Sequence, residues 1–133
     1  MITLDEHLAT LLKNAYVREV EVYQYQINID NYSIMLTGLP QDEFPLELVQ
    51  YKNTPTDELP HSLSDEDISS ISQYQYRDRL RTLVRTEKIE QNKVRLLLES
   101  IKAQLTSNGM DYAVALEEEK ARQTQAAATP PTT

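Results

Sequence analysis

Two long stretches with apolar residues at helical spacing, residues 4–36 and 68–105, restrict this chain to a small set of folds. A segment that holds four of the six prolines separates them. In each stretch the apolar residues recur every three or four positions, as they do on one face of an α-helix. The pattern therefore predicts a mostly α fold, in which a long antiparallel helical hairpin is followed by a short C-terminal helix and a flexible tail.

The first arm, about residues 3–37, can be written as a heptad repeat with Arg18 at one core position. Its apolar core positions are Leu8, Leu11, Ala15, Val22, Tyr25, Ile29, Tyr32 and Leu36. No proline or glycine interrupts the arm before Gly38, where a helix can end. Residues 20–37 include a run of alternating apolar and polar residues that also fits a β-hairpin. We favour a helix because the heptad continues on both sides of this run.

The proline-rich connector, residues 39–63, is more apolar than a free linker. Its apolar residues include Phe44, Leu46, Leu48, Val49 and Tyr51. A stretch of this length inside a compact unit is usually either disordered or packed, and the apolar content favours packing. A short helix near residues 46–51 is compatible with this pattern, and the simplest interpretation of the connector is a loop that covers the end of the hairpin.

The second arm, about residues 65–106, begins at a clear helix start signal. Ser64 is placed to cap the helix, and the carboxylates of residues 65–67 favour the positive end of the helix dipole. Asn108 and Gly109 supply the end of the arm. The apolar seam of this arm consists of Tyr76, Leu80, Leu83, Val84, Val94, Leu97, Leu98, Ile101 and Leu105.

The C-terminal part of the chain completes the predicted domain. Apolar residues after Gly109 indicate a short helix over residues 110–123. The end of the chain is rich in alanine, threonine and proline and buries nothing itself. We therefore predict a single helical domain over residues 1–123 and a flexible tail over residues 124–133.

The second seam is interrupted by polar residues at Glu87, Glu90 and Gln91. An antiparallel alignment of the two arms places Arg18 opposite Glu87. We therefore expect Arg18, Glu87 and Glu90 to act as a register pair. Such a pair would specify the alignment more than it would add stability, because the cost of desolvation offsets much of the attraction.

The sequence contains no motif for catalysis, for metal binding or for a cofactor. Cysteine is absent, and the only histidines are His7 and His61. A metal site built from Glu19, Glu87 and Glu90 would normally add a histidine three residues after a glutamate, and neither histidine is so placed. No nucleophile turn lies near either histidine. We therefore expect no enzyme activity, no catalytic residue, no metal ion and no cofactor.

A second apolar stripe on the first arm points away from the hairpin seam. It consists of Tyr16, Val20, Tyr23, Ile27 and Ile34. A two-helix hairpin cannot bury both this stripe and its seam, and tyrosine is favoured at contact surfaces. We therefore predict a protein interface along the stripe. The alternative is that the connector or the C-terminal helix folds back over it.

A basic stripe follows one flank of the second arm. It consists of Arg77, Arg81, Arg85 and Lys88. This pattern fits either a solvated face neutralised by nearby acids or a docking stripe for an acidic partner surface. The net charge of −8 argues against binding to a nucleic-acid backbone, so we expect no nucleic-acid partner.

The sequence also bears on where the protein is expected to act. No stretch is apolar enough to span a bilayer, and the acidic start of the chain is followed by no signal-peptide core. We therefore expect a protein that is neither secreted nor membrane-spanning and that has no membrane partner.

Residues 25–32 (YQINIDNY) and 76–87 (YRDRLRTLVRTE) resemble segments of small helical proteins encoded among the structural genes of tailed bacteriophages. The resemblance implies a role in the virion, as a tail, baseplate or head–tail component, or in its assembly. It also implies a location in the virion or in the host cytoplasm. It assigns no catalytic residue to this chain.

These observations favour a non-enzymatic structural or assembly protein. We expect it to contact copies of itself or a larger structural protein, as an oligomer or as part of a complex. The alternative is a small acidic adaptor or inhibitor that binds one protein target. The two hypotheses differ in stoichiometry, because a structural subunit enters a many-copy complex whereas an adaptor forms a small one.

Overall fold

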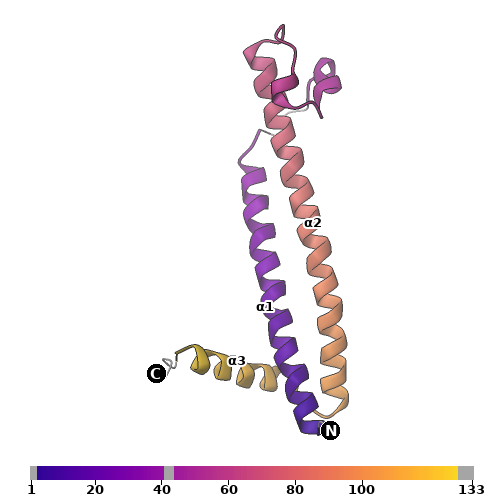
Figure 1. The fold of residues 1–133 in the computed structure, drawn as a ribbon, viewed down its shortest axis with the longest axis vertical. Helices are drawn as coiled ribbons and strands as arrows, with labels where there is room; N and C mark the ends of the chain where they lie inside the picture. Colours follow the sequence, from indigo (N-terminus) through magenta and orange to yellow (C-terminus); the bar gives the residue numbers. More distant parts are fainter. Residues whose placement is uncertain (1–2, 41–43, 129–133) are drawn as a thin grey trace. The chain divides into compact units, whose positions relative to one another are not determined.

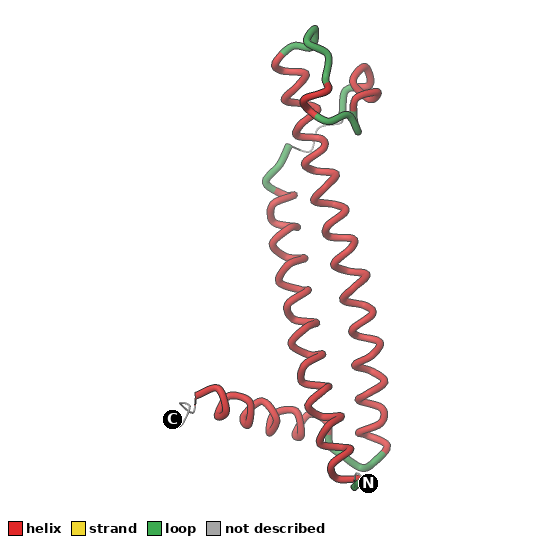
Figure 2. The backbone as a smooth tube through the Cα atoms, in the orientation of Figure 1, coloured by secondary structure: helices red, strands yellow, loops and turns green. Residues whose placement is uncertain are grey.

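The structure, a computed structural model, describes residues 3–40 and 44–128. These residues form five helical segments and no strand (Figures 1 and 2). In chain order they are α1 (Leu4–Thr37), the short 3-10 helices η1 (Leu46–Tyr51) and η2 (Thr56–Glu58), α2 (Asp65–Ser107) and α3 (Tyr112–Ala128). The predicted mostly α fold with two long arms is confirmed. The alternative of a β-hairpin within residues 20–37 is wrong.

The long helices start where side chains satisfy their first free N–H groups. At α1, the backbone N–H of Glu6 donates to Thr3 Oγ1 at 3.2 Å, and the Thr3 N–H donates to Glu6 Oε2 at 3.3 Å. This reciprocal pair is a capping box, which the sequence analysis missed. At α2, the Asp67 N–H donates to Ser64 Oγ at 3.1 Å, so the predicted cap at Ser64 is confirmed.

Gly109 allows the chain to turn at the end of α2. Gly109 has a φ of +83°, in the left-handed region that costs glycine little. The Met110 N–H donates to the Leu105 carbonyl at 3.2 Å, and the Gly109 N–H donates to the Thr106 carbonyl at 2.9 Å. This pair of bonds is a Schellman motif, which satisfies two carbonyls that have no partner inside the helix.

The C-terminal helix is longer than predicted. The sequence indicated a helix over residues 110–123, whereas α3 ends at Ala128. The helix therefore extends over residues 124–128 of the predicted tail, whose alanines and glutamines are compatible with a helix. The remainder of that predicted tail, residues 129–133, lies outside the described residues.

Contacts divide the chain into two compact units. Unit 1 comprises residues 1–26 and 89–133, and unit 2 comprises residues 27–88. Each unit contains part of α1 and part of α2, and α3 belongs to unit 1. The single domain over residues 1–123 stays a prediction.

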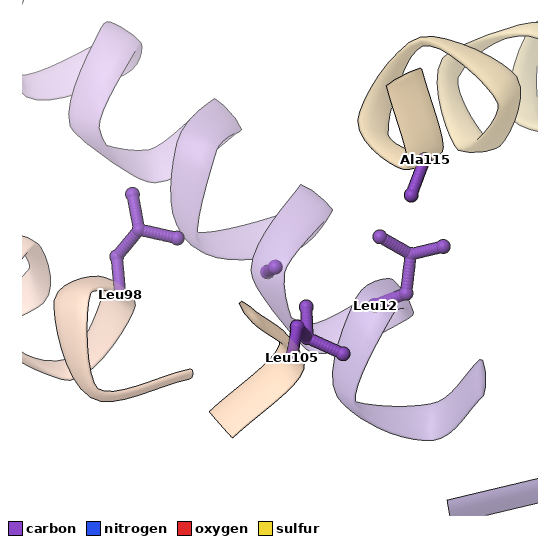
Figure 3. Packing of buried hydrophobic residues seen from close by; sticks show 5 residues of the cluster. Leu12, Leu98, Leu105 and Ala115 are labelled. Atoms are coloured by element: carbon purple, nitrogen blue, oxygen red, sulfur yellow. The ribbon is translucent and has the colours of Figure 1, made fainter. Parts of the chain in front are cut away.

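Unit 1 has a buried cluster to which three helices contribute. Its residues are Leu12 and Ala15 from α1, Leu98 and Leu105 from α2, and Ala115 from α3. Figure 3 shows Leu12 beside Ala115, with Leu105 reaching toward Leu12 from α2. The first turns of α3 are thus part of the core of this unit.

In unit 2, the connector packs onto the first turns of α2. Leu48, Leu59 and Ile71 are buried together. The rings of Phe44 and Tyr74 stack with their centroids 4.4 Å apart. The predicted packing of the connector is therefore confirmed, and the short helix near residues 46–51 is present as η1.

Hydrogen bonds between α1 and α2 fix a register that differs from the predicted one. In unit 1, Gln91 Nε2 donates to the Val22 carbonyl at 3.1 Å and to Gln26 Oε1 at 3.0 Å. In unit 2, Asn28 Nδ2 donates to Glu87 Oε2 at 3.2 Å. The residue that meets Glu87 is therefore about three helical turns further along α1 than Arg18.

The expected register pair of Arg18 with Glu87 and Glu90 is accordingly wrong. Arg18 forms an ion pair with Glu21 of its own helix at 3.0 Å, and Glu90 forms one with Lys93 at 3.0 Å. Both pairs join residues three positions apart, and each of the four side chains keeps at least 33% of its surface exposed. Such local pairs satisfy the charges without burying them, which avoids the desolvation cost of a seam pair.

Candidate functional site

The predicted interface stripe lies along α1 and is mostly uncovered. Val20, Tyr23, Ile27 and Ile34 are exposed, and Tyr16 is half-buried. The exposed fractions of Tyr23 and Ile34 reach 65% and 68%. These values are high for large apolar residues on a long helix. The stripe therefore remains the strongest candidate for a protein interface.

In unit 1, α3 forms one wall of a groove along the first part of this stripe. Tyr16, Val20 and Tyr23 line the groove together with Lys120 and Thr124 of α3, and its volume is about 440 Å³. The alternative, in which the C-terminal helix folds back over the stripe, therefore does not hold for Val20 and Tyr23. Both remain open to solvent beside α3.

A polar cluster positions the start of α3 in unit 1. The Tyr112 hydroxyl donates to Glu19 Oε1 of α1 at 2.8 Å. Lys102 Nζ of α2 lies 3.6 Å from the same oxygen and 5.0 Å from the centre of the Tyr112 ring. Burial, then the hydrogen bond and charge of Glu19, raise the pKa of Tyr112 above its usual value. Tyr112 therefore keeps its proton, and with it the hydrogen bond to Glu19, to a higher pH than an ordinary tyrosine does.

This cluster was not predicted from the sequence, because its three members come from three different helices. Glu19 and Tyr112 are 93 positions apart in the chain. No spacing rule connects residues at such a distance. Glu19 was considered only as a metal ligand, and in the structure its carboxylate accepts from Tyr112 instead.

Farther along α3, Glu119 is a buried carboxylate with only 2% of its surface exposed. Arg122 donates to it through Nε at 2.9 Å and Nη2 at 2.7 Å, and Gln123 donates at 2.8 Å. Burial raises the pKa of Glu119, but the hydrogen bonds from Gln123 and Arg122 and the charges of Arg122 and Lys13 outweigh it. The net effect holds the pKa below its usual value, so Glu119 stays charged.

This environment predicts a specific dependence of stability on pH. Because the pKa of Glu119 is lower in the folded state, its contribution is complete above the unfolded-state value of about 4.3. The contribution is lost as the pH falls through the folded-state pKa. We expect the difference in unfolding free energy between the wild type and Glu119→Gln to shrink from pH 7 to pH 3, measured by urea denaturation. A difference that stays constant or grows would contradict this assignment.

The basic stripe of α2 separates into one structural residue and three exposed ones. Arg77 is buried, its Nη1 donates to the Pro40 carbonyl at 2.7 Å, and its guanidinium lies 5.7 Å from the Tyr74 ring centre. Arg81, Arg85 and Lys88 are exposed. None of these three forms an ion pair with any residue that the structure describes. The prediction of a docking stripe is therefore wrong for Arg77 and stays open for the other three.

Two further findings concern ligands and membranes. The carboxylates once considered for a metal site have other partners: Glu19 has Tyr112, Glu87 has Asn28 and Glu90 has Lys93. Among residues 3–40 and 44–128, no group of three or more histidine, cysteine, aspartate or glutamate side chains could hold a metal ion. Within the same residues, no helix combines the length and the apolar content that a membrane span requires.

Comparison of the chain with models of protein families, with curated proteins and with solved structures found no match. Two exposed sets of side chains remain candidates for contact with a partner. They are the apolar stripe of α1, and Arg81, Arg85 and Lys88 of α2.

Proposed function

We propose that this chain is a non-enzymatic structural or assembly protein, which acts through protein–protein contacts made by the apolar stripe of α1. The observation that supports this proposal is the exposure of Tyr23 and Ile34 to solvent. Fully burying a large apolar side chain contributes about 1.5–3 kcal/mol. A partner that covers these residues would therefore gain free energy that the isolated chain does not.

The spacing of the stripe also suits a contact between proteins. Its members are separated by three, four and seven positions along one helix, so they form a row on one side of α1. Tyrosine adds a large and stiff contact area together with a hydroxyl group for hydrogen bonding. The partner in this proposal is either another copy of the chain or a larger structural protein.

The proposal extends to the kind of assembly. We infer a role in the particle of a tailed bacteriophage, as a tail, baseplate or head–tail component. The resemblance of residues 25–32 and 76–87 to small structural proteins of such phages supports this part. We expect genes for portal, tail or baseplate proteins beside the gene for this chain, and we expect the protein to purify in a many-copy complex of fixed stoichiometry.

Replacement of Tyr23 and Ile27 by Ser in one variant tests the interface. We expect association to weaken at least tenfold, because central apolar anchors carry much of the binding free energy at interfaces. Helix content should stay close to that of the wild type, since serine in a helix costs only about 0.5 kcal/mol. Sedimentation over a range of concentrations measures association, and circular dichroism of the dilute chain measures folding.

A matched control replaces Val17 and Met35 by Ser. Both are exposed apolar residues of α1 that lie outside the stripe. The control should leave association unchanged while making an equal change in helix propensity. If the Tyr23 and Ile27 variant sediments like the wild type but melts at a much lower temperature, the stripe belongs to the protein's own core and the proposal is wrong.

A further inference from the structure

Within unit 2, the register between α1 and α2 brings two exposed rows to the same level. Asn28 and Glu87 are hydrogen-bonded across the pair. Ile27, one residue before Asn28, is therefore level with Lys88, one residue after Glu87. Ile34, six residues after Asn28, is level with Arg81, six residues before Glu87. The apolar row of α1 and the basic row of α2 therefore extend over the same length of the helix pair.

The two rows also lie on the same side of the helix pair. Ile34 stands five positions after the buried Ile29, and Arg81 stands one position after the buried Leu80. Each residue turns the helix by about 100°. Ile34 is therefore rotated about 140° from the seam, and Arg81 about 100°, in the same sense when each helix is viewed along its own direction. Antiparallel helices are related by a two-fold axis normal to their common plane. Rotation in the same sense on both helices therefore brings Ile34 and Arg81 to the same side of the helix pair.

The resulting face of unit 2 combines apolar and positively charged side chains. Ile27 and Ile34 are its exposed apolar residues, seven positions or about 10 Å apart. Arg81, Arg85 and Lys88 are its exposed bases. They have no ion-pair partner within the described part of the chain. Asp30 of α1 is also exposed, and one step after Ile29 rotates it about 100° to the same side, where it is level with Arg85. The face thus carries three bases and one acid.

We propose that this face docks an acidic amphipathic helix of a partner protein. The proposal rests on the proposed function and names the partner's chemistry. An apolar seam on the partner, with residues seven positions apart, would cover Ile27 and Ile34. Glutamates or aspartates along one flank of that seam would pair with Arg81, Arg85 and Lys88, which would steer the encounter and set the orientation of the helix.

Charge argues against nucleic acid on this face and against a second copy that places like helices in contact. If the same face of a second copy lay against it with like helices in contact, the two basic rows would repel each other. Nucleic acid is disfavoured by the net charge of −8 and by the aliphatic rather than aromatic character of the apolar row. An acidic amphipathic helix matches both rows.

The test uses the full chain and a labelled synthetic peptide about 20 residues long. The peptide is an amphipathic helix with leucines along one seam and glutamates along one flank. A control peptide carries lysine in place of each glutamate. Fluorescence anisotropy should show binding of the glutamate peptide that weakens with added salt, and at least tenfold weaker binding of the lysine peptide.

Variants of the chain then locate the contact. Arg81→Glu and Ile34→Ser should each weaken binding of the glutamate peptide at least tenfold. The matched control is Arg79→Glu, which makes the same charge change two positions away on a different side of α2. Arg79 is also exposed, and this control should bind like the wild type. Circular dichroism should show equal helix content in all three variants.

Three outcomes would overturn the inference. They are no binding of the glutamate peptide, equal binding of both peptides, and equal loss of binding in Arg79→Glu and Arg81→Glu. Binding of the chain to phosphatidylserine vesicles that Arg81→Glu abolishes, with no peptide binding, would assign the face to a lipid surface instead. The proposed function stands or falls separately, on sedimentation of the Tyr23 and Ile27 variant.

Discussion

Replacement of Leu105 by Ala is expected to lower the unfolding free energy by about 2–5 kcal/mol. Leu105 has no exposed surface and belongs to the buried cluster of unit 1. The shorter side chain would leave a cavity among residues contributed by α1, α2 and α3. Since whole domains are stable by only about 5–15 kcal/mol, this loss would be large. Urea denaturation followed by circular dichroism measures it.

Leu97→Ala is the matched control for this prediction. It makes the same chemical change on the same helix, but Leu97 is 56% exposed. Little apolar surface returns to water, so we expect a loss below about 1 kcal/mol. Equal losses in the two variants would show that Leu105 is not at the centre of the core of unit 1.

The contrast between Leu97 and Leu98 also shows what periodicity can predict. Both residues belong to the predicted seam, although neighbouring residues on a helix point about 100° apart. In the structure Leu98 is buried and Leu97 is exposed. Apolar periodicity thus identifies which helix has a buried face. The edges of that face depend on the partner helix.

The helix boundaries were predictable because their signals are local. Ser64 caps α2 through a bond to a residue three positions away, and Gly109 ends it with a positive φ. Both signals depend on the chemistry of one or two side chains. The long arms followed from these signals and from the apolar repeat between them. The extension of α3 beyond residue 123 was missed because alanine and glutamine permit a helix without marking its end.

The register of the arms was not predictable in the same way. A heptad repeat matches its partner at several offsets, so the choice depends on the polar residues in the seam. Charge suggested Arg18 with Glu87, whereas the structure uses amides: Asn28 meets Glu87, and Gln91 meets Val22. An amide can donate to a carbonyl oxygen without the desolvation cost of a buried ion pair. The sequence contains no signal that favours these amide contacts over the charge pair.

The candidate site was predicted in part. The position of the apolar stripe follows from spacing along one helix. The exposure of Tyr23 depends on where α3 lies, and the first turns of α3 are positioned by contacts such as that of Tyr112 with Glu19. Arg77 was assigned to the basic stripe because its spacing matches that of Arg81. Its actual partner is a carbonyl 37 positions away.

Replacement of Arg77 by Ala is expected to lower the unfolding free energy by about 2 kcal/mol. The change removes a hydrogen bond from a charged donor to the Pro40 carbonyl and the contact of the guanidinium with the Tyr74 ring. It also removes the buried stem of the side chain, which packs in unit 2. Urea denaturation measures the loss of stability.

Arg81→Ala is the matched control, because it makes the same change one helical turn later at an exposed position. We expect its effect on stability to stay within about 0.5 kcal/mol. Limited proteolysis gives a second measurement: trypsin should cleave after Lys52 in the connector faster in Arg77→Ala than in Arg81→Ala. Each variant lacks one trypsin site, so the comparison is balanced. If both variants are equally stable and equally resistant, Arg77 is a surface residue of the basic stripe, and the bond to Pro40 does not hold the connector in place.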